Sequence, residues 1–222
     1  MQAFTNHRGR VVVLDRADIN TDLIIPARYL KRVERIGYGP LLFADKRYLP
    51  GGAPVADAPE SHGPLDPDFT LNKPEAEGAT VLVVGKNFGC GSSREHAVWA
   101  VAQAGFRAVI APIKGEGFAD IFEGNAYGNG LLPLELPQAD WDAIAAAGLA
   151  QGGAEVAIDL EALTLTLHPA SGDPRTFPIE VPEAQRHRLL NGLDAVAETL
   201  LDEPAITAHE AGRPAWLTPI PA

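Results

Sequence analysis

Cysteine is almost absent from this chain, since Cys90 is the single cysteine among 222 residues. An internal disulfide is therefore excluded. An iron–sulfur cluster is held by about three or four cysteine thiolates, so this chain cannot ligate one by itself. The six histidines show no spacing typical of a metal site and are scattered: His7, His62, His96, His168, His187 and His209. We therefore expect this chain to bind no metal.

The chain also lacks long apolar runs and an excess of positive charge. No stretch of about 18 apolar residues is present, which excludes a membrane-spanning helix. Residues 1–10 contain no apolar signal-peptide core, so we expect a cytoplasmic protein. The formal net charge of −11 argues against nucleic-acid binding, because phosphate backbones are bound by basic surfaces.

What is present is the composition of a globular protein, with 46% apolar and 21% charged residues. The length fits one domain over residues 1–222. Residues 49–68 are rich in proline, glycine and alanine without periodicity, which predicts a long surface loop. Repeated prolines predict an irregular tail over residues 203–222.

Strand-like and helix-like patterns alternate in the middle of the chain. The predicted strands are 10–14, 80–84, 107–111 and 131–136, and the predicted helices are 95–104, 117–124 and 139–147. This alternation predicts an α/β fold with a mixed, largely parallel sheet and flanking helices. Farther on, the pattern predicts a hairpin of 155–160 and 164–168, an edge strand over 176–181 and an amphipathic helix over 182–201.

Residues 85–97, GKNFGCGSSREHA, are the most informative stretch. They lie between a predicted strand and a predicted helix, where the unpaired N–H groups and the positive dipole end of the helix favour an anion. The glycines permit a tight turn, and Arg94 is able to bind a carboxylate or phosphate through two parallel hydrogen bonds. The pattern therefore predicts a small-anion site with serine oxygens beside the bound group.

Two simpler interpretations apply to parts of this stretch. Ser92 and Glu95 also fit a capping box, which would only close the start of the helix. Cys90 fits a small packed residue better than a reactive thiol. The stretch is not a dinucleotide fingerprint, since Arg94 occupies the third glycine position, and the chain has neither a P-loop nor a Gly-x-Ser-x-Gly elbow.

Several motifs in order resemble the swivel domains of the aconitase superfamily and, within it, the small-subunit family of 3-isopropylmalate dehydratase. Besides residues 85–97, these motifs are NTDLIIPARYLK at 20–31, DFTLN at 68–72, FADIF at 118–122, NGLLP at 129–133 and LLNGLD at 189–194. Together they cover most of the chain, from about residue 20 to residue 217.

The resemblance implies a swivelling β/β/α domain that closes over an active site on a separate large subunit. That partner would carry a 4Fe–4S cluster, and the substrate would be a small hydroxy-dicarboxylate. The implied reaction interconverts 2-isopropylmalate and 3-isopropylmalate by dehydration and rehydration, a step of leucine biosynthesis. The chain would thus be part of a hydro-lyase that is active only with its large subunit.

The resemblance also implies roles for individual residues. Ser92 would be the catalytic base, acting as an alkoxide, and Arg94 would bind a substrate carboxylate with help from Ser93. The segment after Pro26 would contact the substrate side chain through Tyr29, Leu30 and Lys31. The residues implied as support for the loop are Gly89, Gly91, Glu95 and His96.

The chain departs from the family pattern around residues 113–117, where IKGEG stands before FAD and a glycine occupies the expected serine position. The exact substrate therefore stays open. A sister hydro-lyase acting on citraconate, (R)-2-methylmalate or a homoaconitase-type acid is one alternative. A module that senses carboxylates without catalysis is another, although it would not require Ser92.

Overall fold

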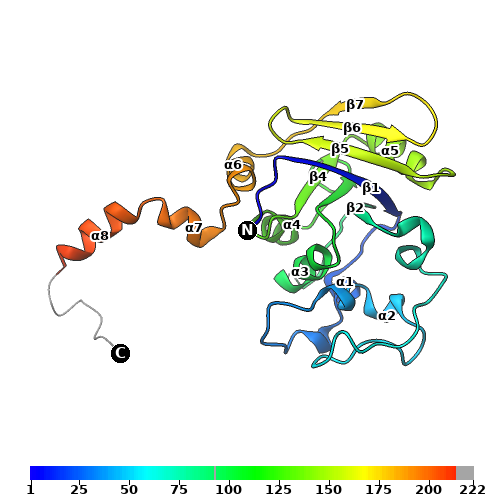
Figure 1. Ribbon diagram of the computed structural model, residues 1–222, viewed down its shortest axis with the longest axis horizontal. Helices are drawn as coiled ribbons and strands as arrows, with labels where there is room; N and C mark the ends of the chain where they lie inside the picture. The colour runs from blue at the N-terminus through cyan, green and yellow to red at the C-terminus, as the bar shows by residue number, and fades with distance from the viewer. Residues whose placement is uncertain (93, 214–222) are drawn as a thin grey trace.

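A seven-stranded sheet with the order β4-β3-β2-β1-β5-β6-β7 organises the chain (Figure 1). The computed structural model describes residues 1–92 and 94–213. The strands are β1 (Asn6–Leu14), β2 (Ala79–Val84), β3 (Ala108–Pro112), β4 (Leu132–Leu136), β5 (Ala154–Asp159), β6 (Thr164–Pro169) and β7 (Arg175–Pro178). Strands β1 to β4 are parallel, and β5, β6 and β7 join antiparallel. The predicted mixed α/β sheet is confirmed, but its antiparallel part is as large as its parallel part.

Strand β1 joins these two halves and is longer than the predicted strand 10–14. Its first half, up to Arg10, pairs antiparallel with β5, and its second half pairs parallel with β2. The first half alternates between exposed and half-buried residues and contains His7 and Arg8, so its hydropathy does not reveal a strand. The antiparallel pairing with β5 therefore determines that these residues form a strand.

Alternating side chains of the central strands fill two separate cores. Val12, Leu82 and Val84 belong to one core, whereas Val11 and Val83 belong to the other. This is the two-sided burial expected when both faces of a parallel sheet are covered. The runs of β-branched residues in β1 and β2 suit such strands.

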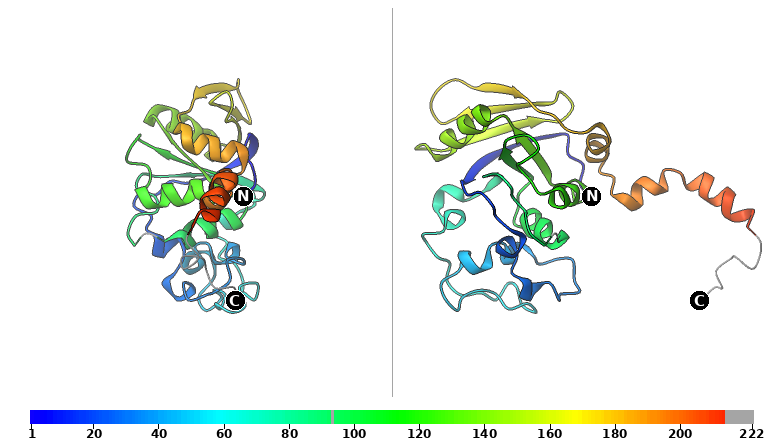
Figure 2. Two further views of the ribbon diagram at one scale, coloured as in Figure 1. Left: turned by 90° about the vertical axis from the view of Figure 1, so that its left-hand side faces the viewer. Right: turned by 180° about the vertical axis from the view of Figure 1, so that it is seen from behind.

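Helices cover both faces (Figures 1 and 2). The α-helices are α1 (Thr21–Ile24), α2 (Ala44–Arg47), α3 (Glu95–Gln103), α4 (Asp120–Gly128), α5 (Gln138–Leu149), α6 (Glu183–Asn191), α7 (Ala195–Leu200) and α8 (Glu203–Ala211). Short 3-10 turns are η1 (Ala27–Tyr29), η2 (Gly39–Leu41), η3 (Thr70–Asn72) and η4 (Pro74–Ala76). Helix α3 contributes to the first core and α5 to the second, where the Trp141 indole donates to the carbonyl of Val84 at 3.0 Å.

The prediction of one continuous helix over 182–201 is wrong, because the segment forms two helices, α6 and α7. Gly192 adopts a left-handed conformation with φ of 65° and ends α6, and the N–H of Leu193 bonds to the carbonyl of Arg188 at 2.9 Å. This is the hydrogen bond of a Schellman motif, for which glycine is well suited. Asp194 then caps a new helix, α7, by accepting from the N–H of Ala197.

The irregular tail predicted over 203–222 is wrong in its first part, because α8 occupies Glu203–Ala211. Pro204 lies in the first turn of this helix, where a missing N–H costs nothing. Residues 214–222 lie outside the described part of the chain. Helices α7 and α8 extend away from the sheet as an arm, and neither contains a buried residue (Figures 1 and 2).

Residues 49–68 contain no helix or strand of more than isolated bridges. Backbone hydrogen bonds tie the two ends of this segment together, from Leu49 to Pro64 and from Gly63 to Gly52. The segment is thus a closed surface loop. Within the described residues, no helix combines the length and hydropathy that a membrane crossing requires.

The contrast between α6 and α7 gives a test of the fold. Leu189 is fully buried, whereas Leu200 is 55% exposed. We expect Leu189→Ala to lower the free energy of unfolding by about 2–5 kcal/mol, because it leaves a cavity. Leu200→Ala should change it by no more than about 0.5 kcal/mol. Urea denaturation of both variants checks this, and an equal cost at the two positions would contradict the assignment of α7 to the arm.

Candidate functional site

The loop that follows β2, residues 85–94, is held on one side by the loop that follows β1. The N–H of Gly89 donates to the carbonyl of Ile19 at 2.8 Å, and the N–H of Thr21 donates to the carbonyl of Cys90 at 2.9 Å. These bonds continue the β1–β2 pairing beyond the strand ends. The 85–94 loop therefore lies at the carboxyl edge of parallel strands, where α/β sheets commonly bind ligands.

The loop that follows β3 holds the other side of the 85–94 loop. Asn87 and Phe88 donate their N–H groups to the carbonyls of Glu116 and Gly117 at 2.8 and 2.9 Å. The carbonyl of Phe88 accepts from the N–H of Ala119 at 3.0 Å. Because residues 117–119 are extended against the 85–94 loop, α4 begins at Asp120 rather than at 117 as predicted.

Two glycines of the loop are required by close approach. A Cβ on Gly85 would lie 2.5 Å from the backbone carbon of Arg16. Gly89 has φ of 79°, and a Cβ there would lie 2.4 Å from the Phe122 ring. Both distances are far shorter than a van der Waals contact, so a side chain at Gly85 would push away the loop after β1 and a side chain at Gly89 would push away helix α4. Gly91 also has a positive φ, of 88°.

Ser92 is exposed at the end of this loop, and its carbonyl accepts from the Thr21 hydroxyl at 2.8 Å. The structure contradicts the capping-box interpretation of Ser92. Helix α3 begins at Glu95 with Arg94 as its N-cap, and the Arg94 side chain makes no capping hydrogen bond. Glu95 instead accepts from the Asn129 amide at 2.9 Å, which ties the helix start to α4. Ser93 lies outside the described residues.

Arg94 is paired with Asp22, a residue for which the sequence patterns predicted no role. Its Nη1 lies 2.8 Å from the Asp22 Oδ1, and the two side chains are 28% and 55% exposed. The partly exposed guanidinium keeps donors open to a bound anion, since it has five N–H groups. Asp22 follows Asn20 and Thr21 in the first of the family-like motifs. Its place in that motif was the one sequence signal that could have indicated a role in the site.

The segment 27–31 follows α1 directly and supplies three predicted substrate contacts. Tyr29 does not fit this role, because it is fully buried and its hydroxyl donates to the carbonyl of Pro54 at 2.7 Å. Leu30 is half-buried against the first core, and Lys31 is exposed. Tyr29 thus anchors the segment to the 49–68 loop through Pro54, while Lys31 faces the solvent.

Burial has the largest effect on the pKa values of Cys90, in the 85–94 loop, and His96, two residues after it. Burial is the largest effect on the pKa of His96 and lowers it; the Glu95 charge raises this pKa by less, and the Arg94 charge lowers it slightly, so the ring is neutral at pH 7. This ring packs 4.7 Å from that of Trp99 and 5.6 Å from that of Tyr38. Burial and the Asp18 charge raise the pKa of the Cys90 thiol. Both residues are therefore neutral, and the His96 ring packs on aromatic rings outside the 85–94 loop.

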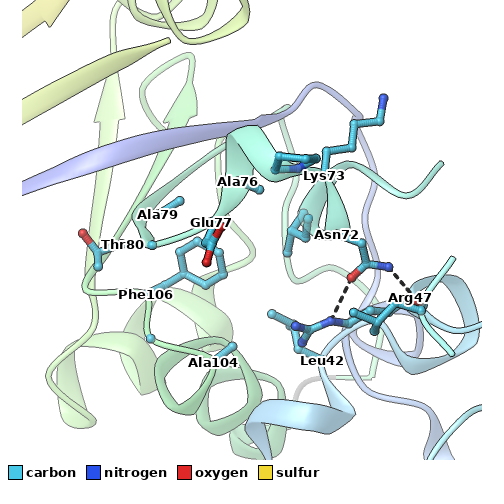
Figure 3. A pocket seen from close by; sticks show the side chains of 15 residues that line it. Leu42, Arg47, Asn72, Lys73, Ala76, Glu77, Ala79, Thr80, Ala104 and Phe106 are labelled. Carbon is cyan, nitrogen blue, oxygen red and sulfur yellow. Dashed lines mark hydrogen bonds between the residues drawn. The ribbon is translucent and has the colours of Figure 1, made fainter. Parts of the chain in front are cut away.

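Two surface hollows lie at opposite ends of the parallel strands. One, of about 470 Å³, is lined by all three loops through residues such as Asp18, Asn87 and Glu116. Another, of about 560 Å³, lies at the opposite ends of β2 and β3, between Thr80, Phe106 and Arg47 (Figure 3). There the Arg47 guanidinium is bonded to Asn72 at 3.2 Å, so it serves the local structure.

Metal ligands do not converge in the described residues, where no group of three His, Cys, Asp or Glu side chains has the required geometry. The single cysteine is likewise unsuited to an iron–sulfur cluster, which needs about three or four thiolates. Such a cluster does not fit the donor set of this chain.

Comparisons with known proteins agree on one family. The aconitase C-terminal domain matches residues 1–139. A 3-isopropylmalate dehydratase small subunit from Teredinibacter turnerae is 48% identical over 96% of this chain and 94% of its own length. One from Shewanella denitrificans is also 48% identical, over 98% of this chain and 100% of its own.

A solved structure gives the same result for the fold. It is a 3-isopropylmalate dehydratase from Methanocaldococcus jannaschii, 28% identical, which covers 93% of this chain and 99% of its own with a TM-score of 0.57.

The raised pKa of Cys90 gives a test of the loop. At about pH 7.5 the thiol is protonated, so iodoacetamide should alkylate Cys90 several-fold more slowly than it alkylates free glutathione. Mass spectrometry of the folded chain over time measures this, with the urea-unfolded chain as the control. Equal rates in the folded and unfolded chains would contradict the raised pKa, and a faster rate in the folded chain would show that Cys90 is a reactive thiol.

Proposed function

Since the chain belongs to the aconitase C-terminal domain family, we propose that it is the small subunit of 3-isopropylmalate dehydratase. In this role it interconverts 2-isopropylmalate and 3-isopropylmalate by dehydration and rehydration, within leucine biosynthesis. The observation that carries the proposal is the exposed Ser92 beside Arg94, on a loop clamped by its two neighbours.

The reaction needs a base for a weakly acidic C–H bond. Ser92, as an alkoxide, takes this proton, a C=C bond forms, and the neighbouring hydroxyl departs as hydroxide, which becomes water by taking a proton from the solvent. Water then adds back with the hydroxyl on the adjacent carbon. An ordinary serine is not ionised at neutral pH, so positive charge and backbone N–H groups must stabilise its alkoxide. Arg94 and the first turn of α3 are the nearest sources in the sequence.

Arg94 binds a substrate carboxylate in this proposal, and Asp22 holds the guanidinium in place before the substrate arrives. The charge-assisted bond at 2.8 Å limits the rotamers of Arg94. Ser93 adds a hydroxyl or N–H to the same group. Leu30 and Lys31 lie on the segment that selects the substrate side chain, which Tyr29 anchors.

The large subunit completes the active site. We place the 4Fe–4S cluster there, because the donor set of this chain does not fit it. When bound, that cluster supplies the Lewis acid for the departing hydroxyl. The chain described here supplies the base, the carboxylate clamp and the cover that excludes water.

The test is co-expression with a candidate large subunit under anaerobic conditions. Absorbance of the unsaturated intermediate follows turnover of 3-isopropylmalate, and consumption of citraconate is followed in parallel. We expect turnover of isopropylmalate only when both subunits are present. Turnover of citraconate alone would move the substrate to the sister enzyme, and tight carboxylate binding by this chain without turnover would favour a sensor.

The role of Ser92 has its own test. We expect Ser92→Ala to assemble with the large subunit but to lose turnover by about a thousandfold, which is the scale of general-base catalysis. Ser171→Ala is the matched control, since Ser171 is exposed in the loop between β6 and β7. Steady-state kinetics and size-exclusion chromatography measure both variants. Normal turnover by Ser92→Ala would exclude it as the base.

A further inference from the structure

The turn between β3 and α4, residues 113–118, is bound by a carboxylate from the neighbouring strand. One oxygen of Glu135 accepts from the N–H groups of Gly117 and Phe118 at 2.9 and 3.2 Å. The other oxygen accepts from the N–H of Gly115 at 2.5 Å. Three backbone donors thus converge on one side chain, and charge-assisted bonds of this kind are the strong ones.

The register of the sheet explains why Glu135 reaches this turn. Glu135 is paired with Ala111, directly before the last residue of β3. Its neighbours Leu134 and Leu136 point into the second core, so Glu135 points to the opposite face. A Cβ on Gly117 would lie 2.9 Å from the Glu135 oxygen and 2.8 Å from the Ala111 Cβ. Glycine at 117, where the family resemblance leads one to expect serine, therefore makes room for the carboxylate.

The same turn carries the acceptors that hold the 85–94 loop. The carbonyls of Glu116 and Gly117 bind the N–H groups of Asn87 and Phe88. Asn87 has φ of 58°, a left-handed conformation that asparagine tolerates better than most residues with a side chain. A displacement of the turn would therefore be transmitted to residues 87 and 88, close to Ser92 in the sequence.

We propose that Glu135 is a positioning residue for the 85–94 loop, which carries Ser92. Its carboxylate binds backbone N–H groups of the 113–118 turn. The turn fixes the positions of Asn87 and Phe88, and these residues fix the position of Ser92. This inference rests on the proposed function for its effect on turnover. The structural link from Glu135 to residues 87 and 88 is independent of the substrate.

The variant Glu135→Gln tests this role while keeping the size of the side chain. One carboxylate oxygen becomes an NH2 group that faces backbone donors, so the turn loosens. Glu180→Gln is the matched control, because the exposed Glu180 contacts the same turn only through the Lys114 side chain. Both variants are made in the full chain and assayed with the large subunit.

We expect Glu135→Gln to lower kcat by about ten- to a hundredfold with KM nearly unchanged, since small misplacements of catalytic groups cost this much. Amide hydrogen exchange at Asn87 and Phe88, resolved by NMR on the full small subunit, should accelerate. Exchange in β5 and β6 should stay as in the wild type. Glu180→Gln should match the wild type in both measurements.

Three results would overturn the proposal: unchanged exchange at Asn87 and Phe88, unchanged kcat in an active complex, or loss of protection across the whole sheet. The last would make Glu135 a residue of general stability. If the wild-type complex does not turn over isopropylmalate, the proposed function fails. The exchange comparison of Glu135→Gln with Glu180→Gln then still decides whether Glu135 positions the loop.

Discussion

Backbone hydrogen bonds that continue past the ends of β1, β2 and β3 are the constraint on which the candidate site depends. They place the 85–94 loop between two neighbouring loops and leave no room for side chains at Gly85 or Gly89. An exposed serine on an ordinary surface loop would have no fixed position. Here the backbone of Ser92 is held by the Thr21 hydroxyl, so the proposed base belongs to a fixed edge of the sheet.

Much of the parallel half of the fold could be predicted from the sequence, because apolar strands and helices alternate there with clear boundaries. The positions of β2, β3, β4 and α5 agree with the predicted ranges within two residues. The polar first half of β1 could not be predicted, since its pairing with β5 is a long-range contact. The break at Gly192 was missed because the apolar residues on both sides keep a helical spacing across it.

The candidate site was predictable where several residues are adjacent in the sequence, as around Ser92 and Arg94. It was not predictable where the partners are distant: Asp22 is 72 residues from Arg94, and their pairing needs the β1–β2 register. The buried position of Tyr29 depends in the same way on the carbonyl of Pro54 in the 49–68 loop. Local patterns thus indicated the candidate base, while its electrostatic and steric surroundings came from tertiary structure.

The arm formed by α7 and α8 has a thermodynamic consequence. Helices of six and nine residues are shorter than those that are stable alone in water, and these two bury no residue. Val196, Leu200 and Leu201 already face the solvent, at 68%, 55% and 61% exposure. Any surface that covers them gains the hydrophobic free energy of burying the area that is exposed here.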